Sequence, residues 1–441
     1  MAAKQLSKPP GPRGHFALGM LVPFRHDPLG TLRAAWQEFG DVVYFRGPLN
    51  GVFLANPRDV DYVMVSAFEN YPHPKWFDGM FAVSANGLVA QEGADWHRLR
   101  DLQEPELADE RVRGFAPIVV EETARLVERW RLAPGVVDAS TDMRDLSHAI
   151  IGRSIFGADW AENAAVLMPA ADVFLDHTGL KINSVGGGPP EWIPVAHNRR
   201  WRRARRAYDE VFYDILRRRR ERGDPGGDIL GALCRTDLSD SEVRENATTT
   251  YVAGHITVHL PLAWLWQLVA EHPEVGERLR DELVALDGRP PGLDDLPRLP
   301  YVDAVVREAL RLYPPLSLQA RTPLRDDVIE GSRIPSGVRL FISSYVSHRH
   351  PDYWDDPERF DPGRFLDGRA AERAPYAWFP FGLGPRECIG IHFALMELRL
   401  VVAGIAQAFR FEPVMERPGI TQDIALRPQP DVSVRIAAVP A

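Results

Sequence analysis

The chain has 441 residues, of which 45% are hydrophobic and 26% are charged, a composition typical of a folded globular protein rather than a disordered one. Its formal net charge of -9 argues against nucleic acid as the main partner. Its apolar runs fall short of the roughly 20 residues needed to span a bilayer, and its N-terminus lacks the apolar core of a signal peptide. With only Cys234 and Cys388 as cysteines, a disulfide framework is excluded, so we expect a cytoplasmic protein without a membrane span.

In chain order, a proline-rich start predicts an extended lead-in over residues 1–14, followed by one large domain over residues 15–441. Alternating apolar residues over 41–55 predict a β-hairpin that turns near Asn50 and Gly51. Helical periodicity then dominates until strand-like pieces around residues 338–344, and a last long helix follows Cys388. The sequence therefore predicts a mainly α fold with a small β region.

One long helix is predicted to cross the centre of the protein. Ser239 and Glu242 form the S-x-x-E pattern of a capping box, and the helical pattern continues to His272, where Pro273 stops it. The middle of this helix is apolar nearly all round, which indicates burial on every side.

The segment around Cys388 carries the most chemical information. Gly382, Gly384 and Pro385 precede the cysteine, and an apolar helix follows, so the sulfur is predicted to lie at a helix N-terminus that favours a thiolate. A nucleophilic cysteine needs a histidine base, which the sequence does not identify, and a zinc site needs further Cys or His ligands. An isolated thiolate points to a metal that brings most of its own ligands, as haem does.

The run from Phe381 to Gly390 matches F-x-x-G-x-R-x-C-x-G and resembles the haem-binding signature of the cytochrome P450 family. The resemblance implies the fold of that family and a haem b (iron protoporphyrin IX) cofactor whose iron is bound by Cys388. It further implies that Arg386 pairs with a haem propionate and that Phe381 packs beside the sulfur. Gly382 belongs to the same haem-binding loop, and Gly390 lets the helix approach the porphyrin.

Two further segments resemble haem-binding elements of the family. Trp96 and Arg100 match its W-x-x-x-R helix and lie at i and i+4, so both can reach one propionate. The alternative is an amphipathic helix with surface arginines. Arg321 occupies the family position that binds the other propionate, although Arg325 lies close by.

Glu308 and Arg311 resemble the E-x-x-R element of the family, in which the pair meets an arginine from a P-x-R-F segment, here Arg364. The expected role of this group is structural: it holds the haem-side core together.

The distal motif of the family, A-G-x-(D/E)-T, here reads Ala253-Gly254-His255-Ile256-Thr257. The resemblance implies that Gly254 leaves room for dioxygen and that Thr257 provides the catalytic hydroxyl, but Ile256 replaces the acid that relays protons. Three explanations remain open: water or a polar substrate group carries the proton, the enzyme uses peroxide or performs oxidative cyclisation, coupling or desaturation, or the haem serves as a sensor without turnover.

Other polar clusters have a structural interpretation. His255 and His259 lie at i and i+4, but the glutamate of the H-E-x-x-H zinc motif is absent. We therefore interpret them as satisfied core histidines. The arginine clusters at residues 199–206 and 217–220 are interpreted as solvated helix faces.

Together these features imply a monomeric thiolate-haem monooxygenase that uses O2 and electrons from a separate ferredoxin and ferredoxin reductase or from a flavoprotein. Substrate contacts are expected from the central helix, from residues 71–88 and 316–319, and from near Thr421. Because these stretches are largely apolar, we expect a sizeable apolar organic substrate and a role in natural-product tailoring, such as antibiotic biosynthesis or other secondary metabolism. The apolar side chains concerned are Trp76, Phe77, Met80, Phe81, Leu316 and Leu318.

Overall fold

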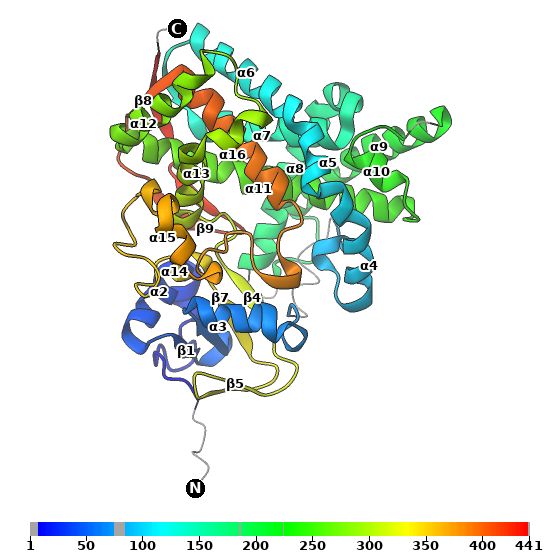
Figure 1. Cartoon of the computed structure of the whole chain (residues 1–441). Coiled ribbons are helices and arrows are strands. Elements are labelled where there is room, and N and C mark those ends of the chain that lie inside the picture. Colours follow the sequence, from blue (N-terminus) through cyan, green and yellow to red (C-terminus); the bar gives the residue numbers. More distant parts are fainter. Residues whose placement is uncertain (1–7, 75–83, 185–186, 224, 440–441) are drawn as a thin grey trace. The chain divides into compact units, whose positions relative to one another are not determined.

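The computed structural model describes residues 8–74, 84–184, 187–223 and 225–439. The chain divides into two compact units, each built from two separate stretches of sequence (Figure 1). Unit 1 contains residues 1–76 and 307–388, and unit 2 contains residues 77–306 and 389–441. The sequence-based boundaries, a lead-in of residues 1–14 and a domain of residues 15–441, stay a prediction.

Unit 1 contains a four-stranded sheet in the order β1-β2-β7-β4. β1 and β2 form the predicted antiparallel hairpin, in which Val42 pairs with Leu54, and Asn50 takes a left-handed φ of 35° at the turn. β7 pairs in parallel with β2 and antiparallel with β4, so the strand expected around residues 338–344 is confirmed. The strands of unit 1 are β1 (Val42–Phe45), β2 (Gly51–Leu54), β4 (Gln319–Arg321) and β7 (Arg339–Ile342), with a separate pair β5 (Asp327–Ile329) and β6 (Ser332–Ile334).

The longest helix that lies entirely in unit 1 is α2 (Pro28–Phe39), which covers this sheet. It begins where Asp27 Oδ1 accepts the Gly30 N–H at 2.8 Å, with Pro28 at its first position, two features that favour a helix start. Its buried Leu32 packs into one apolar cluster with Phe53 of the sheet. The other helices of this unit are short: α1 (Leu21–His26), α3 (Pro57–Asp61), α14 (Ser344–Ser347) and α15 (Asp367–Glu372).

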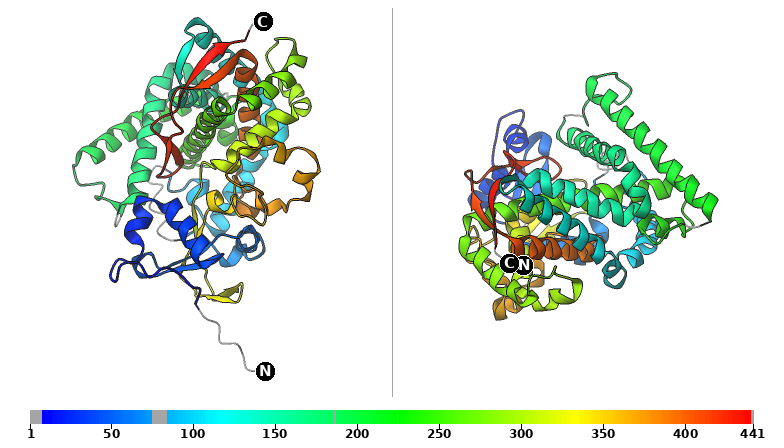
Figure 2. Two further views of the ribbon diagram at one scale, coloured as in Figure 1. Left: turned by 90° about the vertical axis from the view of Figure 1, so that its left-hand side faces the viewer. Right: turned by 90° about the horizontal axis from the view of Figure 1, so that it is seen from above.

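Unit 2 is dominated by helices that pack around α11 (Figure 2). Its sheets are small: β3 (Gly135–Asp138), β11 (Ser433–Ala438) and β8 (Phe409–Pro413) form one, and β9 (Gly419–Gln422) and β10 (Leu426–Gln429) form another. Of helix α13 (Pro300–Leu312), residues 300–306 belong to unit 2 and residues 307–312 to unit 1. The prediction of a mainly α fold with a small β region is confirmed. The helices of unit 2 are α4 (Gly93–Gln103), α5 (Asp109–Val112), α6 (Ala116–Leu132), α7 (Ala139–Phe156), α8 (Trp160–Asn183), α9 (Ala196–Arg222), α10 (Ile229–Cys234), α11 (Asp240–Glu271), α12 (Pro273–Leu283) and α16 (Ile391–Ala408).

Helix α11 is the predicted central helix, and it begins with the predicted capping box. The Glu242 N–H donates to Ser239 Oγ at 3.3 Å, and the Ser239 N–H donates to Glu242 Oε2 at 2.9 Å. The helix ends at Glu271, with His272 as its cap and Pro273 opening the next helix. Most of its side chains from Val243 onward are buried, as its apolar composition predicted.

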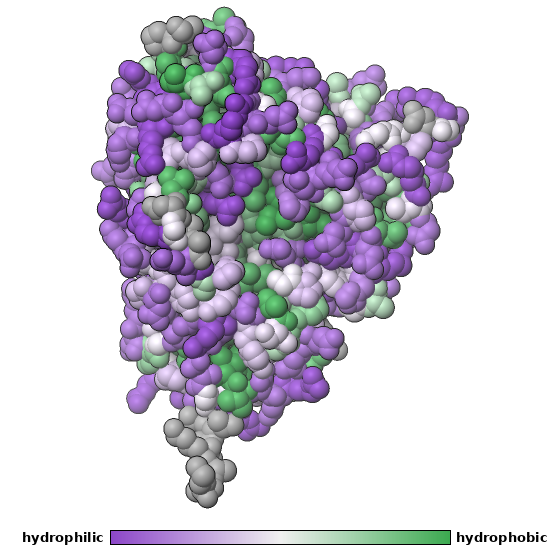
Figure 3. All heavy atoms as spheres, viewed as in Figure 1, coloured by the Kyte–Doolittle hydropathy of each residue, from purple (hydrophilic) through white to green (hydrophobic). Residues whose placement is uncertain are grey.

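The arginine clusters lie on α9, whose side chains contribute to the mainly hydrophilic surface in Figure 3. Most of these arginines are exposed, but the interpretation as a solvated face is wrong for Arg219, which is 5% exposed. Its guanidinium donates to Asp159 Oδ2 at 2.8 Å and to both carboxylate oxygens of Asp228 at 2.7 and 2.8 Å. Arg219 is therefore a buried ion-pair residue, and such residues are tolerated only when paired.

Among the helices in the described part of the chain, only α16 is long and apolar enough to cross a membrane, and 67% of it is buried inside the protein. Such burial is typical of a core helix.

Candidate functional site

Cys388 is presented by a glycine-rich loop of unit 1. Gly384 has a φ of 69°, and a Cβ at this position would lie 2.3 Å from the carbonyl oxygen of Met64, so a larger residue does not fit. The Cys388 N–H donates to the Phe381 carbonyl at 2.9 Å and closes the loop. The result is an exposed cysteine with α16 beginning at Ile391.

The other residues of the signature lie in the same loop or directly after it. Gly382 is buried with a φ of 79°, which only glycine adopts without strain. The Phe381 ring is half-buried, with its centroid 6.2 Å from that of Trp378. Arg386 is half-buried, and Gly390 caps the N-terminus of α16. Phe381, Gly382, Arg386 and Cys388 therefore lie in one loop of unit 1, whereas Gly390 belongs to unit 2.

Arg321 lies on β4 of unit 1 and is only 5% exposed. Its guanidinium donates to the Ala320 carbonyl at 2.9 Å and to Gln319 Oε1 at 3.4 Å. Arg325 is exposed. Of the two arginines considered for the second propionate, Arg321 is thus the one held in a defined, buried position.

Trp96 and Arg100 share one face of α4 in unit 2. Trp96 is 4% exposed, and the guanidinium carbon of Arg100 lies 5.8 Å from the centre of its ring. The Arg100 side chain is 15% exposed and pairs with Glu104 at 3.2 Å. Arg98 on the same helix is exposed, so the alternative of surface arginines describes Arg98 rather than Arg100.

Helix α11 has an open stripe in its otherwise buried middle. Ala253 is exposed, and Gly254 and Thr257 are half-buried, whereas His255 and Ile256 between them are buried. The spacing of the open positions at i, i+1 and i+4 places them on one side of the helix. Thr257 Oγ1 donates to the Ala253 carbonyl at 2.8 Å, so the hydroxyl is at the open stripe.

Gly254 also has a packing role that the sequence did not reveal. A Cβ at this position would lie 2.8 Å from the Ile151 side chain of α7. A residue with a side chain at this position would therefore force the Ile151 side chain to shift, whatever space Gly254 leaves for a ligand.

Ile256, at the position of the missing acid, is buried, unlike the open positions 253, 254 and 257. It is 2% exposed and packs in an apolar cluster with Leu175, Leu260 and Ala425. The chain thus offers no carboxylate at position 256, and it provides an apolar environment there.

His255 and His259 are buried, as predicted for core histidines. His255 Nδ1 donates to the Tyr251 carbonyl at 3.2 Å, and His259 Nδ1 donates to the His255 carbonyl at 2.9 Å. Burial lowers the pKa of His255 well below its ordinary value and the pKa of His259 to about 3. The hydrogen-bonding capacity of His255 is only partly used, however, because its Nε2 has no hydrogen-bond partner among the described residues.

Glu308, Arg311 and Arg364 meet in the core of unit 1, as the resemblance implied. The Arg311 guanidinium donates to both carboxylate oxygens of Glu308 at 2.7 and 2.9 Å, and Arg364 Nε donates to Glu308 Oε1 at 3.0 Å. Glu308 and Arg311 are fully buried.

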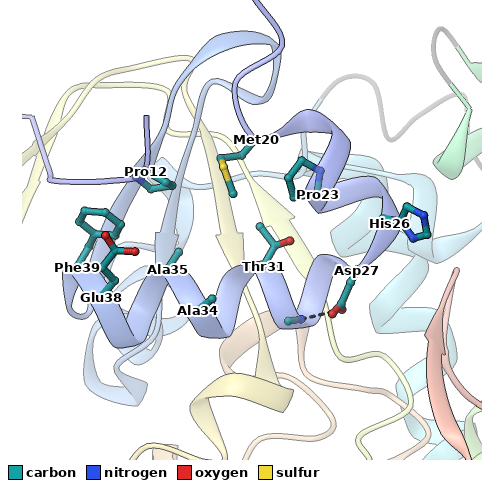
Figure 4. Close-up of a pocket in the computed structure, with 11 residues that line it drawn as sticks. Pro12, Met20, Pro23, His26, Asp27, Thr31, Ala34, Ala35, Glu38 and Phe39 are labelled. Carbon is teal, nitrogen blue, oxygen red and sulfur yellow. Dashed lines mark hydrogen bonds between the residues drawn. The ribbon is translucent and has the colours of Figure 1, made fainter. Parts of the chain in front are cut away.

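The residues expected to contact substrate are only partly within the described chain. Trp76, Phe77, Met80 and Phe81 lie in the stretch 75–83, outside the described residues. Leu316 is 41% exposed, and Leu318 packs against the core of unit 1. A groove of about 430 Å³ along α1 and α2 (Figure 4) has none of the predicted site residues in its lining, and its Asp27 already caps α2.

A sequence model described as Cytochrome P450 matches residues 9–434. The chain belongs to the cytochrome P450 family. It is 32% identical, over 92% of its length and 89% of the relative, to the cyclooctat-9-en-7-ol 5-monooxygenase of Streptomyces melanosporofaciens. It is 28% identical to the pentalenene oxygenase of Streptomyces avermitilis, over 84% of each chain.

Among solved structures, this P450 is similar to the retinoic acid bound cyanobacterial CYP120A1, with a TM-score of 0.87 and 25% identity over 99% of this chain and 100% of that one. The P450 fold predicted from the sequence is confirmed, and the chain is a monooxygenase of a family that uses haem, O2, an organic substrate and redox partners.

The described residues fit a haem. Such a cofactor would need a side chain that can bind its iron and cations that can pair with its propionates. Within unit 1, Cys388 is an exposed cysteine, and Arg321 and Arg386 offer guanidinium groups.

Proposed function

We propose that this P450 binds haem b through Cys388 and oxidises a sizeable apolar, terpene-like substrate with O2. The exposed Cys388, whose backbone N–H closes the loop onto the Phe381 carbonyl, carries the proposal. When bound, the thiolate-ligated haem supplies oxygen activation, because electron donation from the sulfur favours O–O cleavage. The remaining proposed haem-binding residues are Trp96, Arg100, Arg321, Phe381, Gly382, Arg386 and Gly390.

We infer that dioxygen would bind beside the open stripe of α11, with Gly254 and Thr257 as the catalytic positions. The Thr257 hydroxyl donates to the Ala253 carbonyl at 2.8 Å, and rotation about its side chain would let it donate to a ligand instead. Because Ile256 is enclosed in an apolar cluster, the proton must reach Thr257 from water or from a polar group of the substrate. This arrangement supports the first of the three explanations for the missing acid.

A second candidate function follows from the same observation. Oxidative cyclisation, coupling, desaturation or peroxide-driven chemistry would not need the usual acid, and an apolar residue at position 256 is compatible with each of them.

The substrate class is inferred from the relatives and from the sequence. The relatives are named for cyclooctat-9-en-7-ol and pentalenene, both mostly hydrocarbon, and the related structure holds retinoic acid. The expected substrate-contacting stretches of this chain are likewise apolar. We therefore place the enzyme in secondary metabolism, as a cytoplasmic monomer that receives electrons from a separate ferredoxin and its reductase or from a flavoprotein.

The test of the haem assignment is the absorption spectrum of the ferrous carbonyl complex. The wild-type protein should show the spectrum of thiolate-ligated haem, and Cys388→His should change it to that of histidine-ligated haem. Cys234→Ser is the matched control, because Cys234 is the other cysteine of the chain, and it should leave the spectrum unchanged. A globin-like spectrum for the wild type would overturn the assignment.

The substrate assignment is tested by reconstitution with a surrogate ferredoxin and reductase and with cyclic terpene hydrocarbons and alcohols. We expect a haem spectral shift on substrate binding and incorporation of labelled dioxygen into the product. A parallel reaction with peroxide in place of the electron donors tests for peroxide-driven chemistry. The mass of the product distinguishes hydroxylation from the cyclisation, coupling or desaturation of the second candidate function. Electron consumption without any product from the panel would favour the sensor and overturn the proposal.

A further inference from the structure

Three helices of unit 2 bring two histidines and an aspartate together in its interior. His148 comes from α7, Asp172 from α8 and His255 from α11. One ligand atom from each residue lies within 4.8 Å of the ligand atoms of the other two. Both histidines have no exposed surface, and the Asp172 side chain is 41% exposed.

The two imidazoles are arranged by a common neighbour. His148 Nδ1 lies 2.9 Å from the Tyr251 hydroxyl, and His255 Nδ1 lies 3.2 Å from the Tyr251 carbonyl. Metal-binding histidines are typically oriented in this way, with the second ring nitrogen bonded to a neighbouring oxygen. The rings of His148 and His255 stack with their centroids 4.0 Å apart.

The Nε2 atoms are left without partners. Among the described residues neither His148 Nε2 nor His255 Nε2 has a hydrogen-bond partner, although both atoms are buried. Asp172 Oδ1 lies 3.5 Å from His148 Nε2, which is too long for a strong hydrogen bond. Buried polar atoms without partners are rare and need an explanation.

We propose that His148, Asp172 and His255 bind a divalent transition-metal ion, with zinc as the test ion. Two neutral imidazoles and one carboxylate are a usual ligand set for zinc, and water can complete a tetrahedral site. Zinc–nitrogen bonds of about 2.0–2.1 Å place ligand atoms about 3.4 Å apart. His148 Nε2 and Asp172 Oδ1 are already 3.5 Å apart, and the ligand atom of His255, which lies within 4.8 Å of the other two, must approach by at most about 1.4 Å. The half-exposed Asp172 provides both this freedom and an entry path from solvent.

The bound ion would tie α7 and α8 to α11 next to the open stripe of α11. His255 lies between Gly254 and Ile256 in the chain, so an ion on His255 would fix the position of the Thr257 turn. The role is structural, and it is independent of the proposed substrate.

A second histidine cluster of unit 2 serves as an internal comparison. His177 Nδ1 lies 2.9 Å from His197 Nε2, and His177 Nε2 lies 3.2 Å from Glu191 Oε1. Because those nitrogens already have partners, this cluster should not bind the ion.

The experiment uses tag-free holoenzyme that is treated with a chelator, desalted and titrated with Zn2+. We expect about one tightly bound zinc per haem iron by elemental analysis, and a rise in the unfolding midpoint on zinc addition. Asp172→Asn, at a half-exposed position that should tolerate the change, should weaken zinc binding at least tenfold and remove the rise. His197→Gln is the matched control and should change neither.

Two outcomes would overturn the proposal: wild-type protein that binds no stoichiometric zinc, or an Asp172→Asn variant that binds it as tightly as the wild type. X-ray absorption at the zinc edge adds an independent measurement. It should show nitrogen and oxygen ligands with imidazole scattering, and sulfur ligands would contradict the assignment. His148→Gln removes a second ligand and should likewise weaken zinc binding at least tenfold.

Discussion

Glu397 lies within α16 with no exposed surface. The Ser147 hydroxyl donates to its Oε1 at 3.2 Å, whereas Oε2 has no partner among the described residues. Burial raises the pKa of Glu397 to about 8, although the Ser147 hydrogen bond opposes this shift. The folded protein therefore holds this carboxyl in its protonated form at neutral pH.

The raised pKa predicts a pH-dependent loss of stability. Between an ordinary pKa of 4.5 and a folded-state pKa of about 8, the folded state binds the proton and the unfolded state does not. The contribution of Glu397 to the free energy of unfolding is therefore fully present below pH 4.5. It falls by roughly 1.4 kcal/mol per pH unit as the pH rises toward 8. Glu397→Gln keeps the acceptor for Ser147 and removes the titration, so its unfolding midpoint should exceed that of the wild type increasingly over this range.

Calorimetry of both proteins from pH 5 to pH 8 measures the difference, and Glu412→Gln at an exposed position controls for loss of charge. A difference between Glu397→Gln and wild type that does not change with pH would contradict the raised pKa.

Single residues divide clearly into those that the sequence could identify and those that it could not. Cys388 and the glycines of its loop were predictable because their chemistry depends on neighbours within one short segment. His148, Asp172 and Glu397 were not, because their environment is created by side chains from other helices. Arg219 is a similar case. The arginine-rich sequence around it is typical of a solvated helix face, and only the contacts of its guanidinium with Asp159 and Asp228 show that it is a buried ion-pair residue.

At the scale of elements, α11 was well predicted because its start, stop and apolar middle are local features. The capping box at Ser239 and the stop before Pro273 both agree with the structure. Because apolar residues occur all round, the periodicity alone could not show which side of the helix is open, and only the resemblance pointed to Gly254 and Thr257. In the structure Ala253 is exposed and Ile256 is buried. A new side chain at position 256 would therefore enter the protein interior.

Introducing the missing acid by Ile256→Glu should destabilise the protein rather than improve catalysis. The new carboxylate would enter the apolar cluster of Leu175, Leu260 and Ala425, and burying such a group without a partner costs about 2 kcal/mol or more. We expect a lower unfolding midpoint and no increase in the rate of product formation. Ile256→Leu, which conserves volume, should cost less than about 1.5 kcal/mol.

Thermal unfolding and product formation with surrogate electron donors measure both effects of this substitution. A variant with Glu at this position that has an unchanged midpoint and a faster rate would show that its side chain reaches the open stripe after all.

At the scale of the whole molecule, long-range contacts join pieces of chain that no local pattern connects. Unit 1 consists of residues 1–76 and 307–388. Ser347 Oγ donates to the Ala55 carbonyl at 2.8 Å, and Arg33 pairs with Glu358 at 2.8 Å. Such contacts depend on the completed fold, so the sequence could not predict which segments form each unit.

The Glu308, Arg311 and Arg364 group joins several parts of the stretch 307–388 of unit 1. Arg311 donates to the carbonyls of His348 and Pro357 at 2.9 and 2.7 Å, and Arg364 donates to the Asp355 carbonyl at 2.8 Å. Each guanidinium thus fixes backbone that has no regular secondary structure of its own.

Arg364→Met should therefore destabilise the protein strongly. Removing one partner from a buried charged group costs about 3–5 kcal/mol, because the remaining charge and the backbone carbonyls lose their hydrogen bonds. Arg333→Met is the matched control: Arg333 pairs with Asp326 at 2.7 Å, but both side chains are more than half exposed, at 55% and 51%, and such pairs contribute about 0–1 kcal/mol. Denaturant unfolding followed by circular dichroism should separate the two variants by several kcal/mol. Equal losses of stability in the two variants would mean that the buried group does not hold unit 1 together. Arg364→Lys keeps the charge but not the hydrogen-bond geometry, so we expect it to be destabilised like Arg364→Met. If Arg364→Lys were as stable as the wild type, the geometry of the group would not matter.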